Sequence, residues 1–205
     1  MIMAKFIIEH LDVLGKWILI EYKHSYEIAK REGVDLLICG LKLEGIPSTE
    51  KRFYEIFDPK NVIILDPQAN EPLKTEDFDG IDAVIIGGIL GDHPPRGRTK
   101  SLLSDRFPQS KKRNIGKLQF AIDGALYVAI QVMKGKKLEE IPTINGLKII
   151  SEFKGVEDEI ILPFGYPLVN GKPLISEELI KYLIGNRPHR IKWGEDEYIS
   201  YWQHV

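Results

Sequence analysis

The sequence predicts an α/β protein in which helices flank a mostly parallel β-sheet. The main observation is a set of short, nearly uninterrupted apolar runs, rich in β-branched residues, at positions 5–9, 35–41, 61–65 and 82–86. Such runs are typical of strands that are covered on both faces, as in a parallel sheet. The second observation is that segments with helical spacing of apolar residues separate these runs, so strand and helix alternate along the chain.

Helices are expected between and after the apolar runs. The first spans residues 17–31, where Trp17, Ile20 and Ile28 share one side, and Gly33 follows it in the position of a C-cap. Further helices are expected at 48–56, 99–107, 119–133 and 176–184, the first and last of these with Ser48 and Ser176 as N-caps.

The second part of the chain has a different character. Asn145-Gly146 and the Val-Asn-Gly-Lys segment at 169–172 interrupt short β-rich pieces and indicate hairpins. We therefore expect a single domain over residues 1–205, with a β-rich appendage at about 140–175 and a peripheral tail at about 185–205. The aromatic residues of the tail are expected to pack on the body of the protein or on a partner.

The composition is that of an ordinary globular protein. Of the 205 residues, 43% are hydrophobic and 28% are charged, which suffices for one compact core without disulfides. The single cysteine, Cys39, indicates a reducing compartment. The N-terminus reaches Glu9 too early for a signal peptide, and no apolar stretch has the length of a membrane span, so we expect a cytoplasmic protein without membrane contact.

The strongest functional signal is the segment 87–96, Gly-Gly-Ile-Leu-Gly-Asp-His-Pro-Pro-Arg, directly after the fourth apolar run. Ligands of open α/β sheets bind beyond the carboxyl ends of the strands, and glycines let backbone amides approach a ligand closely. The spacing fits neither the dinucleotide fingerprint nor the Walker loop. The segment therefore predicts a ligand-binding loop without naming the ligand, and the alternative is a structural turn with solvated charges.

Two further polar segments follow predicted strands. Glu9-His10 ends the first, and Asp66-Pro67 ends the third, where a carboxylate can accept hydrogen bonds from ribose hydroxyls. The alternatives are a structural ion pair for Glu9 and a simple turn for Asp66-Pro67. The segment Asn114-Ile115-Gly116-Lys117 leads into the long helix, and its backbone could cradle a planar ligand edge.

The sequence gives little support for a metal site, a serine nucleophile or binding to nucleic acid through bulk charge. The five histidines have no paired spacing, Cys39 has no C-x-x-C companion, and no metal site is expected. A G-x-S-x-G nucleophile elbow is also missing from the sequence. The formal net charge of -2 argues against binding nucleic acid through bulk charge. Basic clusters at 111–113, 134–137 and 187–192 could still touch RNA phosphates, although solvated helix ends are the favoured interpretation.

These motifs occur together in one known family. The chain resembles the SPOUT (alpha/beta-knot) methyltransferase family that includes the fungal ribosomal-protein arginine N-methyltransferase. The resemblance rests on segments spread over most of residues 5–184: 6–10, 17–22, 65–67, 87–96 with 98–100, 114–116, Gln119, Asp123, 162–164 and 171–173. The family fold implies that the C-terminal part of the parallel sheet forms a trefoil knot, which no strand pattern would suggest because knots are so rare.

The resemblance implies that S-adenosyl-L-methionine is the cofactor and that three loops bind it. The residues assigned to this methyl donor are Leu65, Asp66, Pro67, Gly88, Ile89, Leu90, Gly91, Asn114, Ile115, Gly116, Leu118 and Phe120. Glu9 and Asp92 are the candidates for gripping an acceptor guanidinium, His93 for orienting a carboxylate or relaying the proton, and Arg96 for binding the donor's methionine carboxylate.

Three functions are weighed on this basis. The first is methylation of an arginine side chain in a ribosomal or other translation-related protein. The second is methylation of rRNA or tRNA, which is the activity of most members of the superfamily. The third is a non-catalytic module for S-adenosylmethionine binding or ribosome assembly. A homodimer is also considered, because many superfamily members form one.

Overall fold

The computed structural model describes residues 4–91 and 96–200. Its first half forms a six-stranded sheet in the order β3-β2-β1-β5-β4-β6, in which every pair of neighbours is parallel. The strands are β1 (Lys5–His10), β2 (Leu36–Cys39), β3 (Ser48–Thr49), β4 (Val62–Leu65), β5 (Ala83–Gly88) and β6 (Lys111–Arg113). The four predicted strands are thus confirmed, and they form the middle of the sheet.

The apolar runs are continuous because both faces of the sheet are covered. Along β1, Phe6 and Ile8 face one hydrophobic cluster, which includes residues of the long helices, whereas Ile7 faces a second cluster around Phe53 and Leu103. Successive side chains of a strand point to opposite faces, so an all-apolar strand supplies both clusters at once.

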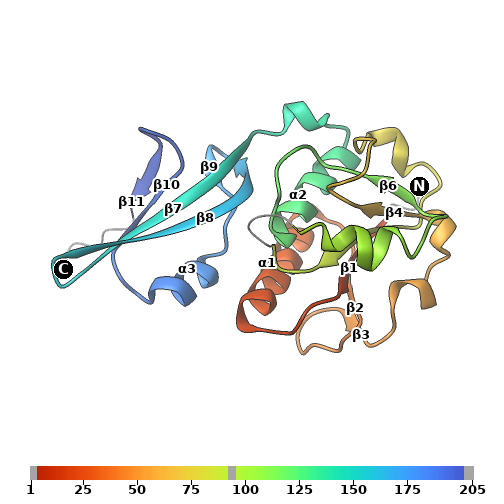
Figure 1. The fold of residues 1–205 in the computed structure, drawn as a ribbon, viewed down its shortest axis with the longest axis horizontal. Coiled ribbons are helices and arrows are strands. Elements are labelled where there is room, and N and C mark those ends of the chain that lie inside the picture. The colour runs from red at the N-terminus through yellow and green to blue at the C-terminus, as the bar shows by residue number, and fades with distance from the viewer. Residues whose placement is uncertain (1–3, 92–95, 201–205) are drawn as a thin grey trace.

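Two long helices cover the first face (Figure 1). Helix α1 (Lys16–Glu32) ends at Gly33, whose φ of 72° lets its N–H reach the carbonyls of the last turn. Helix α2 (Ile122–Met133) begins three residues later than the predicted 119–133 and carries mostly buried side chains. Both long helices are therefore confirmed.

The shorter helices differ from expectation. The predicted helix at 48–56 is wrong: the Ser48 backbone belongs to β3, and its hydroxyl binds within the local loop to Leu43 and Ile46. Within the predicted range, the structure has the 3-10 turn η1 (Phe53–Glu55). The predicted helix at 99–107 is reduced to the π-helical turn η4 (Lys100–Ser104). The remaining short turns are η2 (Pro59–Asn61), η3 (Thr75–Phe78) and η5 (Leu138–Glu140).

The second half forms an antiparallel five-stranded sheet in the order β11-β10-β7-β8-β9. Its strands are β7 (Thr143–Phe153), β8 (Val156–Val169), β9 (Lys172–Pro173), β10 (His189–Lys192) and β11 (Tyr198–Ser200). Helix α3 (Glu177–Ile184) packs on one face, and the Ser176 hydroxyl caps it as predicted by accepting from Leu179 N. Residues 189–192, expected in a peripheral tail, pair with β7.

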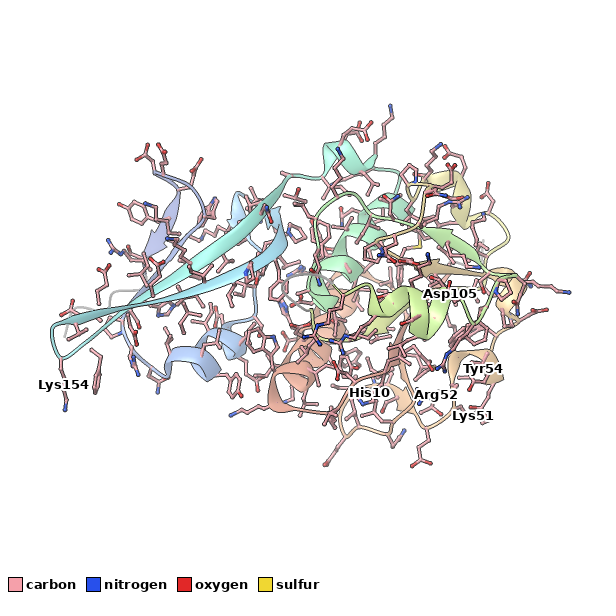
Figure 2. All side chains as sticks on the ribbon, in the orientation of Figure 1. His10, Lys51, Arg52, Tyr54, Asp105 and Lys154 are labelled. Atoms are coloured by element: carbon pink, nitrogen blue, oxygen red, sulfur yellow. The ribbon has the colours of Figure 1, made fainter. Side chains whose placement is uncertain are left out.

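One of the two predicted hairpin turns is confirmed. Asn170 and Gly171 take positive φ between β8 and β9, as the sequence predicts. Asn145-Gly146 instead lies inside β7, where the pairing with β8 shifts register in a β-bulge. The turn of the long hairpin falls at Lys154-Gly155, at the tip that extends away from the parallel sheet (Figures 1 and 2).

The two sheets meet through the helices. Trp17 of α1 packs against the apolar cluster between the second sheet and α3, and Phe120 forms an isolated bridge with Gly165 of β8. Trp193 packs on the same cluster, as expected for the aromatic tail, whereas Tyr198 is exposed, and Tyr201 and Trp202 lie outside the described residues. No helix within residues 4–91 and 96–200 is long and apolar enough to cross a membrane.

Candidate functional site

A pocket of about 200 Å³ opens at the carboxyl edge of the parallel sheet. Because β4, β5 and β6 are parallel neighbours or near neighbours, the segments that leave them meet at this edge. The pocket is lined by residues 65–68 at the end of β4, by Ile86, Gly87 and 89–91 at the end of β5, by 96–99, by 115–120 after β6, and by Ile122 and Ala125 of α2.

The structure brings most of the predicted donor-binding residues together in this pocket. All but two of the twelve line it: Leu65, Asp66, Pro67, Ile89, Leu90, Gly91, Ile115, Gly116, Leu118 and Phe120. They come from three segments that are far apart in the sequence and follow three different strands. The lining combines apolar side chains with the backbone of glycine-containing turns, which suits a ligand with a flat apolar part and polar edges.

Gly88 and Asn114 have supporting roles beside the pocket. A Cβ atom at Gly88 would overlap the Tyr22 hydroxyl and lie 2.8 Å from the Glu9 carbonyl oxygen, so glycine is required for packing α1 on the sheet. The Asn114 side chain donates to the Ala69 carbonyl at 2.9 Å and accepts from Gly116 N at 3.0 Å. Asn114 thus fixes the turn that presents Gly116 to the pocket.

Asp66 uses its carboxylate within the protein. One oxygen accepts from Gln68 N at 2.9 Å and the other accepts from the Ser104 hydroxyl at 2.6 Å, and the residue is buried. These two hydrogen bonds hold the loop after β4 against η4. The carboxylate that the sequence suggested for ribose hydroxyls therefore shapes this wall of the pocket.

Glu9 is placed differently from the expectation that it grips an acceptor. It does not line the pocket and is only 1% exposed. Its oxygens accept from Arg52 Nη1 at 3.2 Å and from Phe53 N at 3.0 Å, and Arg52 also donates to the His10 carbonyl at 2.7 Å. Burial raises the pKa of Glu9, although the Phe53 amide and Arg52 oppose this shift. Glu9 anchors η1 to the end of β1, where Figure 2 labels Arg52 and His10.

The other predicted catalytic residues belong to the loop after β5. Arg96 is exposed and lines the pocket. Asp92 and His93 lie outside the described residues, so their predicted roles stay predictions.

Comparison with known proteins identifies the family. Residues 5–188 match the model of the family described as protein arginine N-methyltransferase SFM1-like. The chain belongs to this family. A relative in Saccharomyces cerevisiae, protein arginine N-methyltransferase SFM1, is 30% identical over 204 residues, which cover 86% of this chain and 92% of the yeast protein.

Solved structures agree with this assignment. The crystal structure of yeast SFM1 complexed with SAM superposes with a TM-score of 0.73 at 28% identity, covering 89% of this chain and 91% of that one. A dual specific Trm10 from Thermococcus kodakaraensis gives a TM-score of 0.54 at 22% identity, covering 67% and 96%. The Trm10 likeness bears on the fold alone, and it confirms the SPOUT-type sheet flanked by helices. The trefoil knot stays a prediction.

Sequence reasoning missed a clamp that holds the loop after β5 in this SFM1-like protein. Arg98 donates to the Leu90 carbonyl at 2.7 Å and to the Asp12 carboxylate at 3.2 Å, while Leu90 N donates to the same carboxylate at 3.3 Å. Burial acts to raise the pKa of Asp12, but the Val13 amide and Arg98 bring it below its usual value. The only signal in the sequence was the place of Asp12 just after a strand.

A second missed contact lies behind the same loop. His10 Nδ1 and the Tyr22 hydroxyl are 2.7 Å apart, and Tyr22 is fully buried against Gly88. Burial and then the positive charge of Arg52 lower the pKa of His10, which favours the neutral imidazole. This pair ties α1 to the ends of β1 and β5.

Proposed function

We propose that this protein transfers the methyl group of S-adenosylmethionine to an arginine side chain of another protein. The observation that carries the proposal is the pocket at the carboxyl edge of the sheet, which three loop segments build in a chain of the SFM1-like family. Yeast SFM1, the relative with the same overall structure, is named an arginine methyltransferase and has been solved with SAM, SAH and MTA.

The reaction is an in-line displacement at the methyl carbon. A guanidino nitrogen forms a bond to this carbon while the bond to the sulfonium sulfur breaks, S-adenosylhomocysteine leaves, and the nitrogen releases a proton to solvent or to a nearby base. Methyl transfer of this kind needs positioning of two reactants more than it needs acid-base groups. We assign the positioning of the donor to the apolar and backbone lining of the pocket.

Arg96 is our candidate for the polar end of the donor. It is exposed at the pocket, and a guanidinium binds a carboxylate through two parallel hydrogen bonds. We propose that Arg96 holds the methionine carboxylate of S-adenosylmethionine, while the adenine part occupies the apolar side near Leu118 and Phe120.

The proposal is tested by binding and by the place where the label appears. Calorimetry should detect binding of both S-adenosylmethionine and S-adenosylhomocysteine. If neither binds, the result would favour a non-catalytic protein that does not use a methyl donor. Incubation with methyl-labelled donor and either ribosomal proteins or RNA should label protein, and acid hydrolysis should release methylarginine. Label in RNA alone would overturn the protein-arginine proposal and support an RNA methyltransferase.

Three further predictions accompany the proposal. The acceptor is a ribosomal protein, the protein is located in the cytoplasm, and the chain forms a homodimer. Fractionation of ribosomal proteins after labelling checks the first, cell fractionation the second, and light scattering of the purified chain the third.

A further inference from the structure

A cluster of buried polar side chains lies between α1 and α2, outside the pocket. Glu21 of α1 is 4% exposed and Asp123 of α2 is 5% exposed. His24 Nδ1 lies 2.6 Å from the Asp123 carboxylate, in a mostly buried contact. Carboxyl groups are rarely buried unless they have partners, so the contacts of Glu21 indicate what it does.

Glu21 joins helix α1 to the start of helix α2. Trp17 Nε1 donates to one carboxyl oxygen at 2.7 Å, and Ile122 N donates to the other at 3.2 Å. Ile122 is the first residue of α2, and the N–H groups of a first turn have no acceptor inside their own helix. The N-cap residue is Ala121, whose methyl side chain cannot accept a hydrogen bond. Glu21 therefore caps α2 from the neighbouring helix.

The capped end of α2 continues a wall of the pocket. Residues 115–120 line the pocket, and Ile122 lines it as well. On the other side, Gly165 N of β8 donates to the Gln119 carbonyl at 2.8 Å, and a Cβ atom at Gly165 would lie 2.7 Å from Leu118 Cβ. Residues 115–122 are thus held on one side by β8 and on the other by the Glu21 carboxyl group. Trp17, which donates to Glu21, packs on the apolar cluster that β8 shares with α3.

We propose that Glu21 is a positioning residue for the donor site: by capping α2 through Ile122, it holds the wall formed by residues 115–122 in the shape that binds the methyl donor. The proposal rests on the proposed function for the identity of the ligand. It assigns no contact between Glu21 and the donor.

The electrostatics of Glu21 predict that donor binding depends on pH. Burial raises its pKa to about 8, the nearby Asp123 adds to the increase, and the hydrogen bonds from Trp17 and Ile122 oppose it. The other ionisable groups whose charges act on or near it are Tyr22 on α1 and Tyr166 on β8, while His24 of α1 faces the neighbouring Asp123. Ionising Glu21 in this buried place is therefore less favourable than in water, so a rise in pH is expected to weaken the cap on α2.

The first experiment measures the Kd of S-adenosylhomocysteine, a ligand that cannot react. We expect Glu21→Ala to weaken binding about tenfold, because both hydrogen bonds are lost, and Glu21→Gln to weaken it about threefold, because an amide oxygen replaces only one acceptor. Raising the pH from 7 to 9 should weaken binding in the wild type and leave Glu21→Gln unchanged. Glu21→Gln also carries the test if Glu21→Ala does not fold.

A matched control separates positioning from a general loosening of the helix pair. Glu32, at the far end of α1, accepts hydrogen bonds from Gln131 and Lys134 at the other end of α2. Glu32→Gln should leave the Kd unchanged. An equal loss in Glu32→Gln, or a wild-type Kd and a wild-type pH profile in both Glu21 variants, would overturn the proposal.

Amide hydrogen exchange separates this inference from the proposed function. In the ligand-free protein, Glu21→Ala should speed exchange at Ile122 and in residues 115–120, with no change at the amides of β1. If the wild type binds no donor, the proposed function fails, and the exchange result alone decides whether Glu21 holds the wall. Unchanged exchange at Ile122 would then reject the positioning role.

Discussion

Arg52 lies across the end of β1 with its guanidinium 3.2 Å from the buried Glu9 carboxylate and 2.7 Å from the His10 carbonyl. A Cβ atom at Gly40 would lie 2.6 Å from Arg52 Nη1, so the absence of a side chain there leaves room for this guanidinium. The contact is the structural ion pair that the sequence offered as the alternative for Glu9, and the acceptor-binding role stays a prediction.

Arg52→Ala is expected to lower the free energy of unfolding by about 2 kcal/mol, because it leaves the buried Glu9 oxygen without its charged partner. Urea denaturation at pH 7 measures the loss. Arg106→Ala, at an exposed arginine, should change the free energy of unfolding very little. A wild-type midpoint for Arg52→Ala would show that the Glu9 contact contributes nothing to stability.

Asp77 ties the edge strand β6 to η3. Arg113 donates to its two oxygens at 2.8 and 2.7 Å, and Lys111 Nζ lies 3.3 Å away. Burial acts to raise the pKa of Asp77, but the hydrogen bonds from Arg113 and Lys74 hold it below the usual value of 3.8.

Asp77→Asn should therefore destabilise the protein by about 1–2 kcal/mol at pH 7, since hydrogen bonds to charged groups are lost. The folded-state pKa lies below the unfolded one, so this stabilisation is complete above the unfolded pKa and is lost as pH falls through the folded pKa. Urea midpoints of the wild type and the variant should differ at pH 7 and converge below pH 3.8. A constant difference over this range would contradict the ion-pair account.

The parts of the fold that the sequence predicts are determined by local residue patterns, whereas the other parts depend on long-range contacts. The central strands were predictable because strands such as β1 and β5 are covered on both faces, which makes each of them a local apolar run. The edge strand β6 was not, because Lys111-Lys112-Arg113 has the pattern of a solvated basic cluster and becomes a strand only by pairing with β4. Its charges are held by contacts to Asp77 and to the Phe107 carbonyl.

In the candidate site, too, the position of the pocket was predictable from local sequence, whereas the contacts of individual side chains were not. Glycine-rich and proline-containing segments after strands marked the pocket, because such segments collect at one edge of a parallel sheet. The partners of individual side chains could not be derived this way. Glu9 meets Arg52 from a segment 43 positions away, and Glu21 meets Ile122 from a segment 101 positions away. These contacts depend on tertiary packing, which periodicity does not encode.

The clamp formed by Asp12 and Arg98 predicts an effect on donor binding. Asp12→Asn should raise the KM for S-adenosylmethionine about three- to tenfold with a smaller change in kcat, because the charged contact to Arg98 that steadies Leu90 is weakened. Initial-rate kinetics measure both constants. Asp79→Asn, at an exposed position outside the pocket, serves as the control, and an equal rise in KM there would rule out the clamp as the cause.

Gly91 gives the sharpest test of the pocket, because a steric change there can be reversed. A Cβ atom at Gly91 would lie 2.5 Å from a ring carbon of Phe164 and 3.1 Å from the Gln119 amide nitrogen. Gly91→Ala should force the loop after β5 away from β8 and weaken S-adenosylhomocysteine binding at least about tenfold. Its φ is not positive, so the effect is steric rather than a backbone strain.

The double variant Gly91→Ala with Phe164→Ala removes the ring that the added methyl group would meet. It should recover most of the lost affinity, although Phe164→Ala alone weakens the apolar cluster under the second sheet. Calorimetry on the four proteins of this cycle yields the coupling between the two sites. Strictly additive losses would mean that Gly91 is required for a reason other than the approach of Phe164, because two residues that collide must couple when one of them is truncated.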